Sequence, residues 1–308
     1  TLHRTTSAKT RATATLRQLH IPPNVRQHSK TIYHKMEPTT FQIKDFNSII
    51  KIGTTFGKNW YRGHSRVFNN LTPKVFRPEY QTIIDELLRP QFEFETVENF
   101  KRYAPAVLGN LPASSDNLSW LLIMQHHGFT TRLLDWSENI LVALFFAVVD
   151  LQNEDGELWS MYPYKLNQCS GFDGIPLPTS RLLAFLSNEP FHNAPEMLVK
   201  EYNLAFTPNK PIAFLPTRVI PRISNQMSAF TIHPKPSEGN TIPELISGEE
   251  NLVRYIISSK LKPVFEKNLS YLGISYRTLF PDIEGLSKDF KREEKYYGWG
   301  QPRHPKIE

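Results

Sequence analysis

The sequence has few of the features that build disulfide frameworks, metal motifs or membrane spans. One cysteine, Cys169, occurs in 308 residues, which excludes an internal disulfide and any CxxC metal motif. The longest uninterrupted apolar run is the ten residues 140–149, whereas a membrane-spanning helix needs about twenty. Neither GxxxxGK(S/T) nor GxGxxG occurs, and Ser65 lacks a surrounding GxSxG. We therefore expect no transmembrane helix, no metal site and a reducing, cytoplasmic location.

Acidic residues are absent from the first 36 positions, where the basic charge is concentrated. Seven of the 36 Lys and Arg residues lie there, which leaves 29 basic against 30 acidic residues in the rest of the chain. We interpret residues 1–36 as a disordered basic tail or as sequence upstream of a true start at Met36. An organelle-targeting peptide and a nucleic-acid-binding arm are the alternatives. Residues 37–308 are nearly neutral, and we expect them to form one domain that does not bind nucleic acid.

Hydrophobic periodicity predicts a mixture of helices and short strands from residue 37 onward. The segment 41–56 begins extended and becomes helical, and 130–136 is extended. Further helices are expected near 79–88 and 92–104, from about Leu118 to a left-handed cap at Gly128, over 137–151 with Ser137 as N-cap, and over 259–273 and 281–293. Further strands are expected at 59–63, 156–163, 210–216, 228–234 and 252–258. Because no regular βαβ period connects them, the predicted fold class is α+β.

Two stretches place polar groups within apolar surroundings. WYRGHS at 60–65 sets an arginine between an aromatic residue and a glycine. The second stretch, LLIMQHHGFTTRLLDWSENILVALFFAV at 121–148, carries seven polar side chains between two apolar helices, namely Gln125, His126, His127, Thr130, Thr131, Arg132 and Asp135. Burying polar and charged groups is costly unless they are paired. The second stretch is therefore either a hydrogen-bonded hub that joins the helices or the lining of a cleft.

Four blocks of this sequence resemble the signature blocks of the FRG domain, a bacterial family named for its (F/Y)RG motif. They are YRGHS, MQHHGFTTRLLDWSENILVALFFAV, RISNQMSAFTIH at 222–233 and TLFPDIEGLSKD at 278–289, in the order of the family over about residues 56–292. Their layout is similar to that of the ADP-ribosyltransferase superfamily. That superfamily uses three motifs in order. The first is an aromatic-Arg-Gly or His-Gly sequence at the end of an early strand, and the second is a strand with Ser/Thr or Tyr followed by a helix rich in Ala and aromatics. The third is a Glu or Gln that leads into a later strand. The resemblance implies a split sheet with surrounding helices, with Tyr61-Arg62-Gly63, residues 130–146 and Asn225-Gln226 as the three motifs.

This resemblance implies an enzyme that consumes NAD, either by transferring ADP-ribose to a macromolecular acceptor or by hydrolysing NAD, as a bacterial toxin or phage-defence effector. The candidate catalytic residues are Arg62, Gln226 and His127. The candidate NAD contacts are Tyr61, Arg62, Gly63, His64, Thr131, Arg132 and Trp136. A guanidinium group binds phosphates or ribose hydroxyls through paired hydrogen bonds, and a glycine lets nicotinamide approach the main chain.

The third motif departs from the strongest form of the pattern because Gln226 is neutral. A glutamine can hydrogen-bond a ribose hydroxyl, but it cannot neutralise the positive charge that develops when the nicotinamide bond breaks. A carboxylate is then expected from elsewhere in the chain. The candidates are Asp135, Glu249, Glu250 and Glu284.

Structural interpretations of the same residues stay open at this stage. Arg62 is compatible with an ordinary structural ion pair as well as with ligand binding. One of His126 and His127 is compatible with a hydrogen-bonded position in the core. Arg132 with Asp135 is most simply a buried ion pair, and Trp136 is a core residue or a stacking surface. The competing functions are a non-catalytic sensor that binds a nucleotide or peptide in the same cleft, and an enzyme acting on nucleic acid, which only the basic tail supports.

Overall fold

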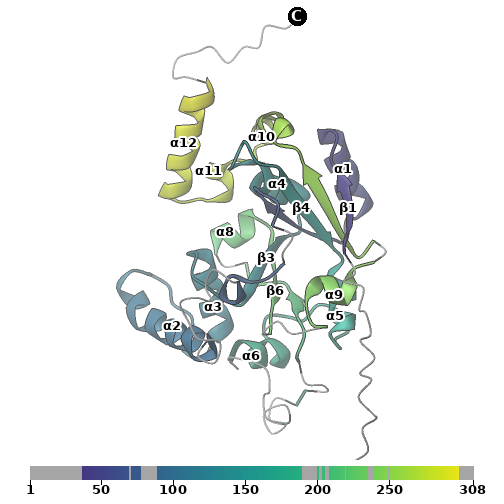
Figure 1. The fold of residues 1–308 in the computed structure, drawn as a ribbon. Helices are drawn as coiled ribbons and strands as arrows, with labels where there is room; N and C mark the ends of the chain where they lie inside the picture. Colours follow the sequence, from purple (N-terminus) through teal and green to yellow (C-terminus); the bar gives the residue numbers. More distant parts are fainter. Residues whose placement is uncertain are drawn as a thin grey trace, which may run out of the picture. The chain divides into compact units, whose positions relative to one another are not determined.

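A mixed sheet of seven strands organises the structure, with the order β1-β7-β4-β2-β3-β6-β5 (Figure 1). The strands are β1 (Thr39–Gln42), β2 (Trp60–His64), β3 (Leu133–Ser137), β4 (Gly156–Met161), β5 (Ile212–Phe214), β6 (Ser228–Ile232) and β7 (Leu252–Ile257). β1 runs parallel to β7, and all other neighbouring pairs are antiparallel. The predicted α+β class is confirmed.

The computed structural model describes residues 37–68, 71–77, 89–188, 200, 203–204, 208–218, 220–234, 239–248 and 250–297. The interpretation of residues 1–36 and the predicted helix at 79–88 lie outside these ranges. The α-helices are α1 (Phe46–Thr55), α2 (Arg89–Tyr103), α3 (Asn117–His126), α4 (Ile140–Val148), α5 (Pro163–Cys169), α6 (Arg181–Asn188), α8 (Pro221–Asn225), α9 (Ile242–Ile246), α10 (Lys262–Tyr271), α11 (Tyr276–Leu279) and α12 (Ile283–Tyr297). Within the described residues, three short 3-10 helices are η1 (Lys74–Phe76), η3 (Ala104–Ala106) and η4 (Ser259–Leu261). Within the described ranges, no helix combines the length and the apolar character needed to cross a membrane.

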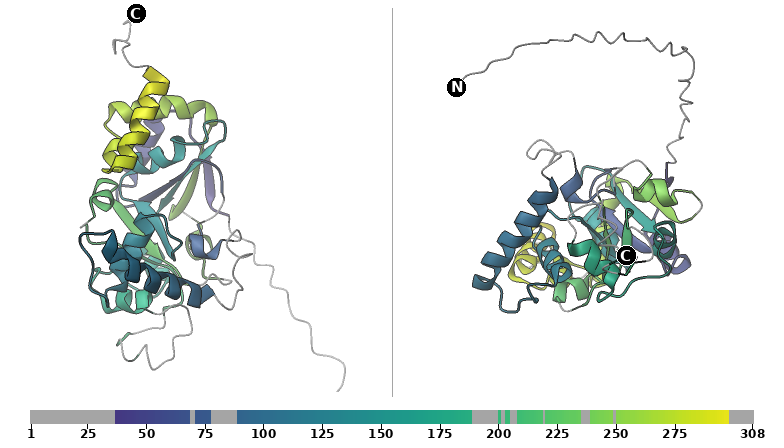
Figure 2. Two further views of the ribbon diagram at one scale, coloured as in Figure 1. Left: turned by 90° about the vertical axis from the view of Figure 1, so that its left-hand side faces the viewer. Right: turned by 90° about the horizontal axis from the view of Figure 1, so that it is seen from below.

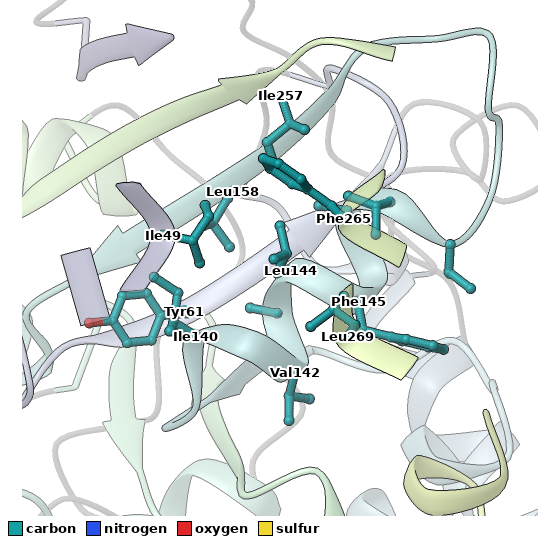
Figure 3. Packing of buried hydrophobic residues seen from close by; sticks show 14 of the residues in the cluster. Ile49, Tyr61, Ile140, Val142, Leu144, Phe145, Leu158, Ile257, Phe265 and Leu269 are labelled. Atoms are coloured by element: carbon teal, nitrogen blue, oxygen red, sulfur yellow. The ribbon is translucent and has the colours of Figure 1, made fainter. Parts of the chain in front are cut away.

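Helices cover both faces of the sheet and divide the core into three apolar clusters. One cluster joins α1, α4 and α10 to β2, β4 and β7 (Figure 3). A second joins α3 and α6 to β3, β5 and β6, and a third packs α5 and α9 against the opposite face. Helices α10, α11 and α12 lie toward one end of the sheet, and α2, α3 and α6 lie toward the other (Figures 1 and 2).

Helix α4 is buried almost throughout because all nine of its residues are Ile, Leu, Val, Ala or Phe within an uninterrupted apolar run. Its N-cap is Asn139, whose side chain accepts a hydrogen bond from the Leu141 amide at 2.9 Å. The predicted N-cap, Ser137, is instead the last residue of β3, so that prediction was wrong by two residues. The predicted left-handed cap at Gly128 is confirmed by a φ of 78°.

Gly63 and Gly156 allow α4 to lie very close to β2 and β4. A Cβ atom on Gly63 would lie 1.8 Å from the carbonyl oxygen of Ala143, and one on Gly156 would lie 2.3 Å from that of Ala147. Ala143 and Ala147 are four residues apart and therefore lie on the same side of the helix. The glycine of the YRG motif is thus required by helix packing. The sequence interpretation expected this glycine to let nicotinamide approach the main chain, and it did not foresee a role in helix packing.

Candidate functional site

A pocket of about 220 Å³ lies beside the point where β2 meets β3. We call it the Arg62 pocket. Its charged and amide side chains come from segments far apart in the sequence, and they are Arg62, Gln125, Asp135, Arg222 and Gln226. Phe146 and Val142 of α4 form an apolar wall. The structure therefore brings the predicted first and third motifs together with part of the second.

The pocket exists because β2 and β3 separate after a single residue pair. Tyr61 pairs with Ser137, and a continuous antiparallel ladder would place Arg62 opposite Trp136 and then Gly63 opposite Asp135. Instead, the Arg62 Nη1 atom donates to the main-chain carbonyl of Asp135 at 2.6 Å. The guanidinium group thus bridges two strands that no longer hydrogen-bond directly. This opening in the sheet places a cation at the pocket wall.

A buried chain of hydrogen bonds holds Arg62 from behind. Its Nε donates to His64 Nε2 at 2.9 Å, and His64 Nδ1 lies 2.7 Å from Glu157 Oε1. Because Nε2 accepts a hydrogen bond from Arg62, the ring proton is on Nδ1, which donates a hydrogen bond to the fully buried Glu157. Burial and the nearby charge of Arg62 lower the pKa of His64 to about 4, so the imidazole is neutral at neutral pH. The carboxylate of Glu157 thereby balances Arg62 through a neutral histidine.

Arg62 itself remains a cation with one nitrogen available to a ligand. Burial lowers its pKa to about 10, which still leaves it protonated at neutral pH. Its side chain is 13% exposed. Among the described residues, its hydrogen bonds use Nε and Nη1 but not Nη2. The open nitrogen can therefore bind an anion without breaking the existing contacts.

Asp135 places a carboxylate at the same pocket. Its side chain is 52% exposed, and its Oδ2 lies 3.6 Å from Arg62 Nη1. Gln125 Nε2 donates to this Oδ2 at 2.7 Å, and Thr131 Oγ1 donates to Gln125 Oε1 at 2.5 Å. The hydroxyl thus fixes the orientation of the amide, which in turn fixes the carboxylate. The polar residues of the second stretch therefore form both a hydrogen-bonded hub and a pocket wall.

Arg132 does not contribute to this pocket, and the predicted Arg132–Asp135 ion pair is wrong. Arg132 is buried and pairs with Glu93 of α2, with its Nε donating to Glu93 Oε2 at 2.6 Å and its Nη2 contacting the same oxygen. The Arg132 amide also donates to Glu93 Oε1 at 2.9 Å. A buried guanidinium needs a buried counter-charge, and α2 supplies one from 39 residues earlier, while Asp135 remains exposed.

A tight turn between α8 and β6 presents Gln226. Its main-chain carbonyl accepts from Ser137 Oγ at 2.7 Å, and the next carbonyl, of Met227, accepts from the Glu138 amide at 2.9 Å. Met227 has a φ of 45°, which costs free energy for a residue other than glycine. The Gln226 Nε2 donates to the Leu279 carbonyl at 3.1 Å. Its Oε1 has no hydrogen-bond partner within the described part of the chain and is available to accept one.

Arg222, one helical turn before Gln226, was missed by sequence reasoning. Its Nη1 donates to the His126 carbonyl at 2.8 Å, and its guanidinium lies 4.2 Å from the centre of the Phe280 ring. Burial lowers its pKa. The signal in the sequence was the spacing of four residues from Gln226, which places both on one side of a helix.

Glu157 was also missed as a residue that supports the pocket. It is an acidic residue inside the apolar strand GELWSM, and that unusual position was the available signal. It does not line the pocket itself and acts through His64.

The remaining predicted residues are divided between the pocket and its surroundings. Tyr61 and Trp136 line the pocket but are largely core residues, with hydrogen bonds to the Phe56 carbonyl and to Thr231 Oγ1. His127 ends α3 in an exposed position and does not line the pocket, so the structure does not support its predicted catalytic role.

His64 and Thr131 act behind the lining, through Arg62 and Gln125. Of the candidate carboxylates, Asp135 lines the pocket, Glu250 and Glu284 do not, and Glu249 lies outside the described residues.

The chemistry of the Arg62 pocket is that of an anion site with one carboxylate. Two guanidinium groups suit phosphate oxygens, and the amide oxygen of Gln226 and the carboxylate of Asp135 suit hydroxyl donors. In the described ranges, no group of three or more His, Cys, Asp and Glu side chains could hold a metal ion.

Comparison with protein families identifies one match. The FRG domain matches residues 57–156, a segment that contains β2, α3, β3 and α4 and thus Arg62, Gln125 and Asp135. This confirms the predicted resemblance to the FRG domain family. The blocks at 222–233 and 278–289 lie outside the matched segment. Comparisons with curated proteins and with solved structures gave no significant match.

Proposed function

We propose that this chain, with its FRG domain match over residues 57–156, is an enzyme that consumes NAD, either as an ADP-ribosyltransferase or as an NAD hydrolase. The observation that carries the proposal is that Arg62, Asp135 and Gln226 line one pocket. Arg62 lies in β2, Asp135 lies in β3 and Gln226 lies two residues before β6, and these three strands are neighbours in the sheet. The order of these three motifs, and the opening between β2 and β3, support an ADP-ribosyltransferase-like split sheet as part of the proposal.

In the proposed complex, the two guanidinium groups bind the anionic part of NAD. Arg62 offers its free Nη2 atom, and Arg222 lies on the same pocket wall. The pocket volume of about 220 Å³ is below the roughly 300–1,000 Å³ of sites that enclose a whole drug-sized ligand. The pocket therefore takes the nicotinamide riboside end, with the aromatic ring of Phe146 on its wall, and the adenosine end lies outside it.

The proposed reaction breaks the bond between nicotinamide nitrogen and the ribose C1′ carbon. The bonding electron pair leaves with nicotinamide and neutralises its ring charge, while positive charge develops on the ribose. Asp135 stabilises that charge, and the Gln226 amide oxygen holds a ribose hydroxyl. Water or an acceptor nucleophile then bonds to C1′ and gives its proton to solvent. Asp135 thus supplies the negative charge that Gln226 lacks.

The test is the release of free nicotinamide from NAD by the full chain, with and without cell extract as a source of acceptor. We expect release by the wild type, and a loss of about 100-fold or more in Arg62→Ala, because this guanidinium is part of the preorganised site. Arg181→Ala, at an exposed arginine of α6, is the matched control and should retain full activity. Transfer of radiolabelled ADP-ribose to protein or nucleic acid separates a transferase from a hydrolase.

A non-catalytic nucleotide sensor is the second candidate, and one observation favours it. The Asp135 carboxylate already contacts Gln125 and Arg62, which reduces its capacity to stabilise a new positive charge. A sensor would bind NAD or ADP-ribose in an Arg62-dependent way but release no nicotinamide under any condition. A toxin or defence effector that depletes NAD would instead lower cellular NAD when it is expressed, and Arg62→Ala would abolish that effect.

A further inference from the structure

A second and larger pocket lies among the C-terminal helices. It has a volume of about 410 Å³ and is lined by α10, α11, α12 and the Phe145 end of α4. We call it the C-terminal pocket. Its volume is within the roughly 300–1,000 Å³ typical of small-molecule sites. It belongs to the region of the block TLFPDIEGLSKD, to which the proposed NAD chemistry assigns no role.

The lining of the C-terminal pocket combines an edge-to-face aromatic pair with one cation that lacks an acidic partner. Phe145 and Tyr276 meet edge to face with their ring centres 5.1 Å apart, and Ile274 extends this apolar surface. The two acidic residues of the lining are each paired with an arginine, as Glu266 with Arg292 and Asp289 with Arg277. Lys267, the third basic residue, is exposed and forms no ion pair within the described ranges. An aromatic or other flat apolar group with an attached anion complements this surface.

Helix α11 connects the C-terminal pocket to the Arg62 pocket. Tyr276 and Thr278 line the C-terminal pocket. The carbonyl of Thr278 accepts from Asn225 Nδ2 at 2.8 Å, and that of Leu279 accepts from the Gln226 side chain at 3.1 Å.

Aromatic contacts form a parallel connection through Phe280. Its ring lies 5.5 Å from that of Tyr276, 6.0 Å from that of Phe146 and 4.2 Å from the guanidinium of Arg222. Gly285 allows α12 to lie close to this segment, because a Cβ atom there would lie 2.0 Å from the Phe280 carbonyl oxygen. A shift of α11 therefore alters the contacts that hold the side chains of Gln226, Arg222 or both.

We propose that the C-terminal pocket binds a small amphipathic anion with a flat apolar ring, and that the bound ligand fixes α11 and thereby the Arg222–Gln226 wall of the Arg62 pocket. The two states are a pocket-filled α11, held against Phe145, and a pocket-empty α11 that moves more freely. A ligand that binds only the first state shifts the population toward it. The effect on catalysis rests on the proposed NAD chemistry, whereas the binding and the structural coupling do not.

The experiment titrates the full chain with 8-anilinonaphthalene-1-sulfonate, a flat apolar ring system with one anionic group, and follows its fluorescence. We expect one saturable site. Lys267→Glu should weaken binding by about tenfold through loss of the charged contact. Lys165→Glu, at an exposed lysine of α5 outside the pocket, is the matched control and should bind as the wild type does. Ser270→Trp, at an exposed lining position, should fill the pocket and abolish binding.

Coupling is read from amide hydrogen exchange at residues 222–227 with and without the probe, in the absence of NAD. We expect slower exchange at the amides of Gln226 and Met227, whose acceptors are the Arg222 and Ser224 carbonyls. Absence of saturable binding, or binding that persists in Ser270→Trp, would overturn the pocket assignment. Binding without a change in exchange at 222–227 would overturn the coupling. Neither readout needs nicotinamide release, so a failure of the proposed enzymatic function remains distinguishable.

Discussion

Gly63→Ala tests the claim that the glycine of the YRG motif is fixed by helix packing. The added Cβ would lie 1.8 Å from the Ala143 carbonyl oxygen, 2.8 Å from the Ala147 nitrogen and 2.9 Å from the Ala143 carbonyl carbon. Ordinary contact begins near 3.4 Å, so α4 must move by about 1.6 Å. All three atoms are helix backbone and cannot rotate away. Overpacking typically costs about 1–3 kcal/mol, and we expect about 3 kcal/mol or more here.

Urea denaturation followed by circular dichroism measures this loss as a lower free energy of unfolding. Gly57→Ala is the matched control, because the nearest atom to its added Cβ is 3.9 Å away and its backbone needs no positive φ. Its free energy of unfolding should stay within about 1 kcal/mol of the wild-type value. Equal stability of the two variants would refute the close packing of α4 on β2. An Ala143→Gly change should not rescue Gly63→Ala, because the clash is with the main chain.

Three further predictions concern the charged and polar groups of the site. Glu93→Gln should lower the free energy of unfolding by about 3–5 kcal/mol, because it leaves the buried Arg132 guanidinium unbalanced, and a loss below about 1 kcal/mol in chemical denaturation would contradict the buried pair. His64 has a pKa of about 4 in the folded state and 6.5 ordinarily. Between these pH values the unfolded chain binds a proton that the folded chain does not. The free energy of unfolding therefore falls as the pH is lowered from 6.5 toward 4. His64→Gln should flatten the pH dependence of Tm in that window, and an unchanged slope would argue against a neutral, buried His64. Gln226→Glu should raise nicotinamide release about tenfold, or about 1.4 kcal/mol of transition-state stabilisation, whereas no gain would count against Gln226 as the ribose contact.

The local elements were largely predictable from the sequence because their signals are local. The apolar run at 140–149 and the glycine at 128 predicted α4 and the end of α3 to within a few residues. The N-cap was misplaced because Ser137 and Asn139 are both good capping residues, and the pairing of Ser137 in the sheet decides between them.

The partners of the charged residues could not be predicted because they depend on tertiary structure. Arg132 pairs with Glu93 across 39 residues, and Arg62 is balanced by Glu157 through His64, which lies 93 residues before Glu157. Sequence proximity suggested Asp135 as the partner of Arg132, although residues three apart in an extended segment point to opposite faces. Alternation along β3 places Asp135 away from Leu134 and Trp136 and into the gap between α3 and α4.

The role of Gly63 was equally beyond sequence reasoning. A glycine beside an arginine suits close ligand approach as well as close helix approach, and only the position of α4 distinguishes them. Arg62 and Gly63 of the motif both position elements around the pocket. Gly63 brings α4 onto β2, and Arg62 bridges β2 to β3.

Nicotinamide release by Asp135→Asn, measured beside the affinity for ADP-ribose, tests the central claim most directly. The substitution removes the negative charge and keeps the shape of the side chain. If the Asp135 carboxylate stabilises the developing ribose cation, release should fall by about 100-fold or more while ADP-ribose affinity changes only a few-fold. Release at the wild-type rate by Asp135→Asn would contradict the account.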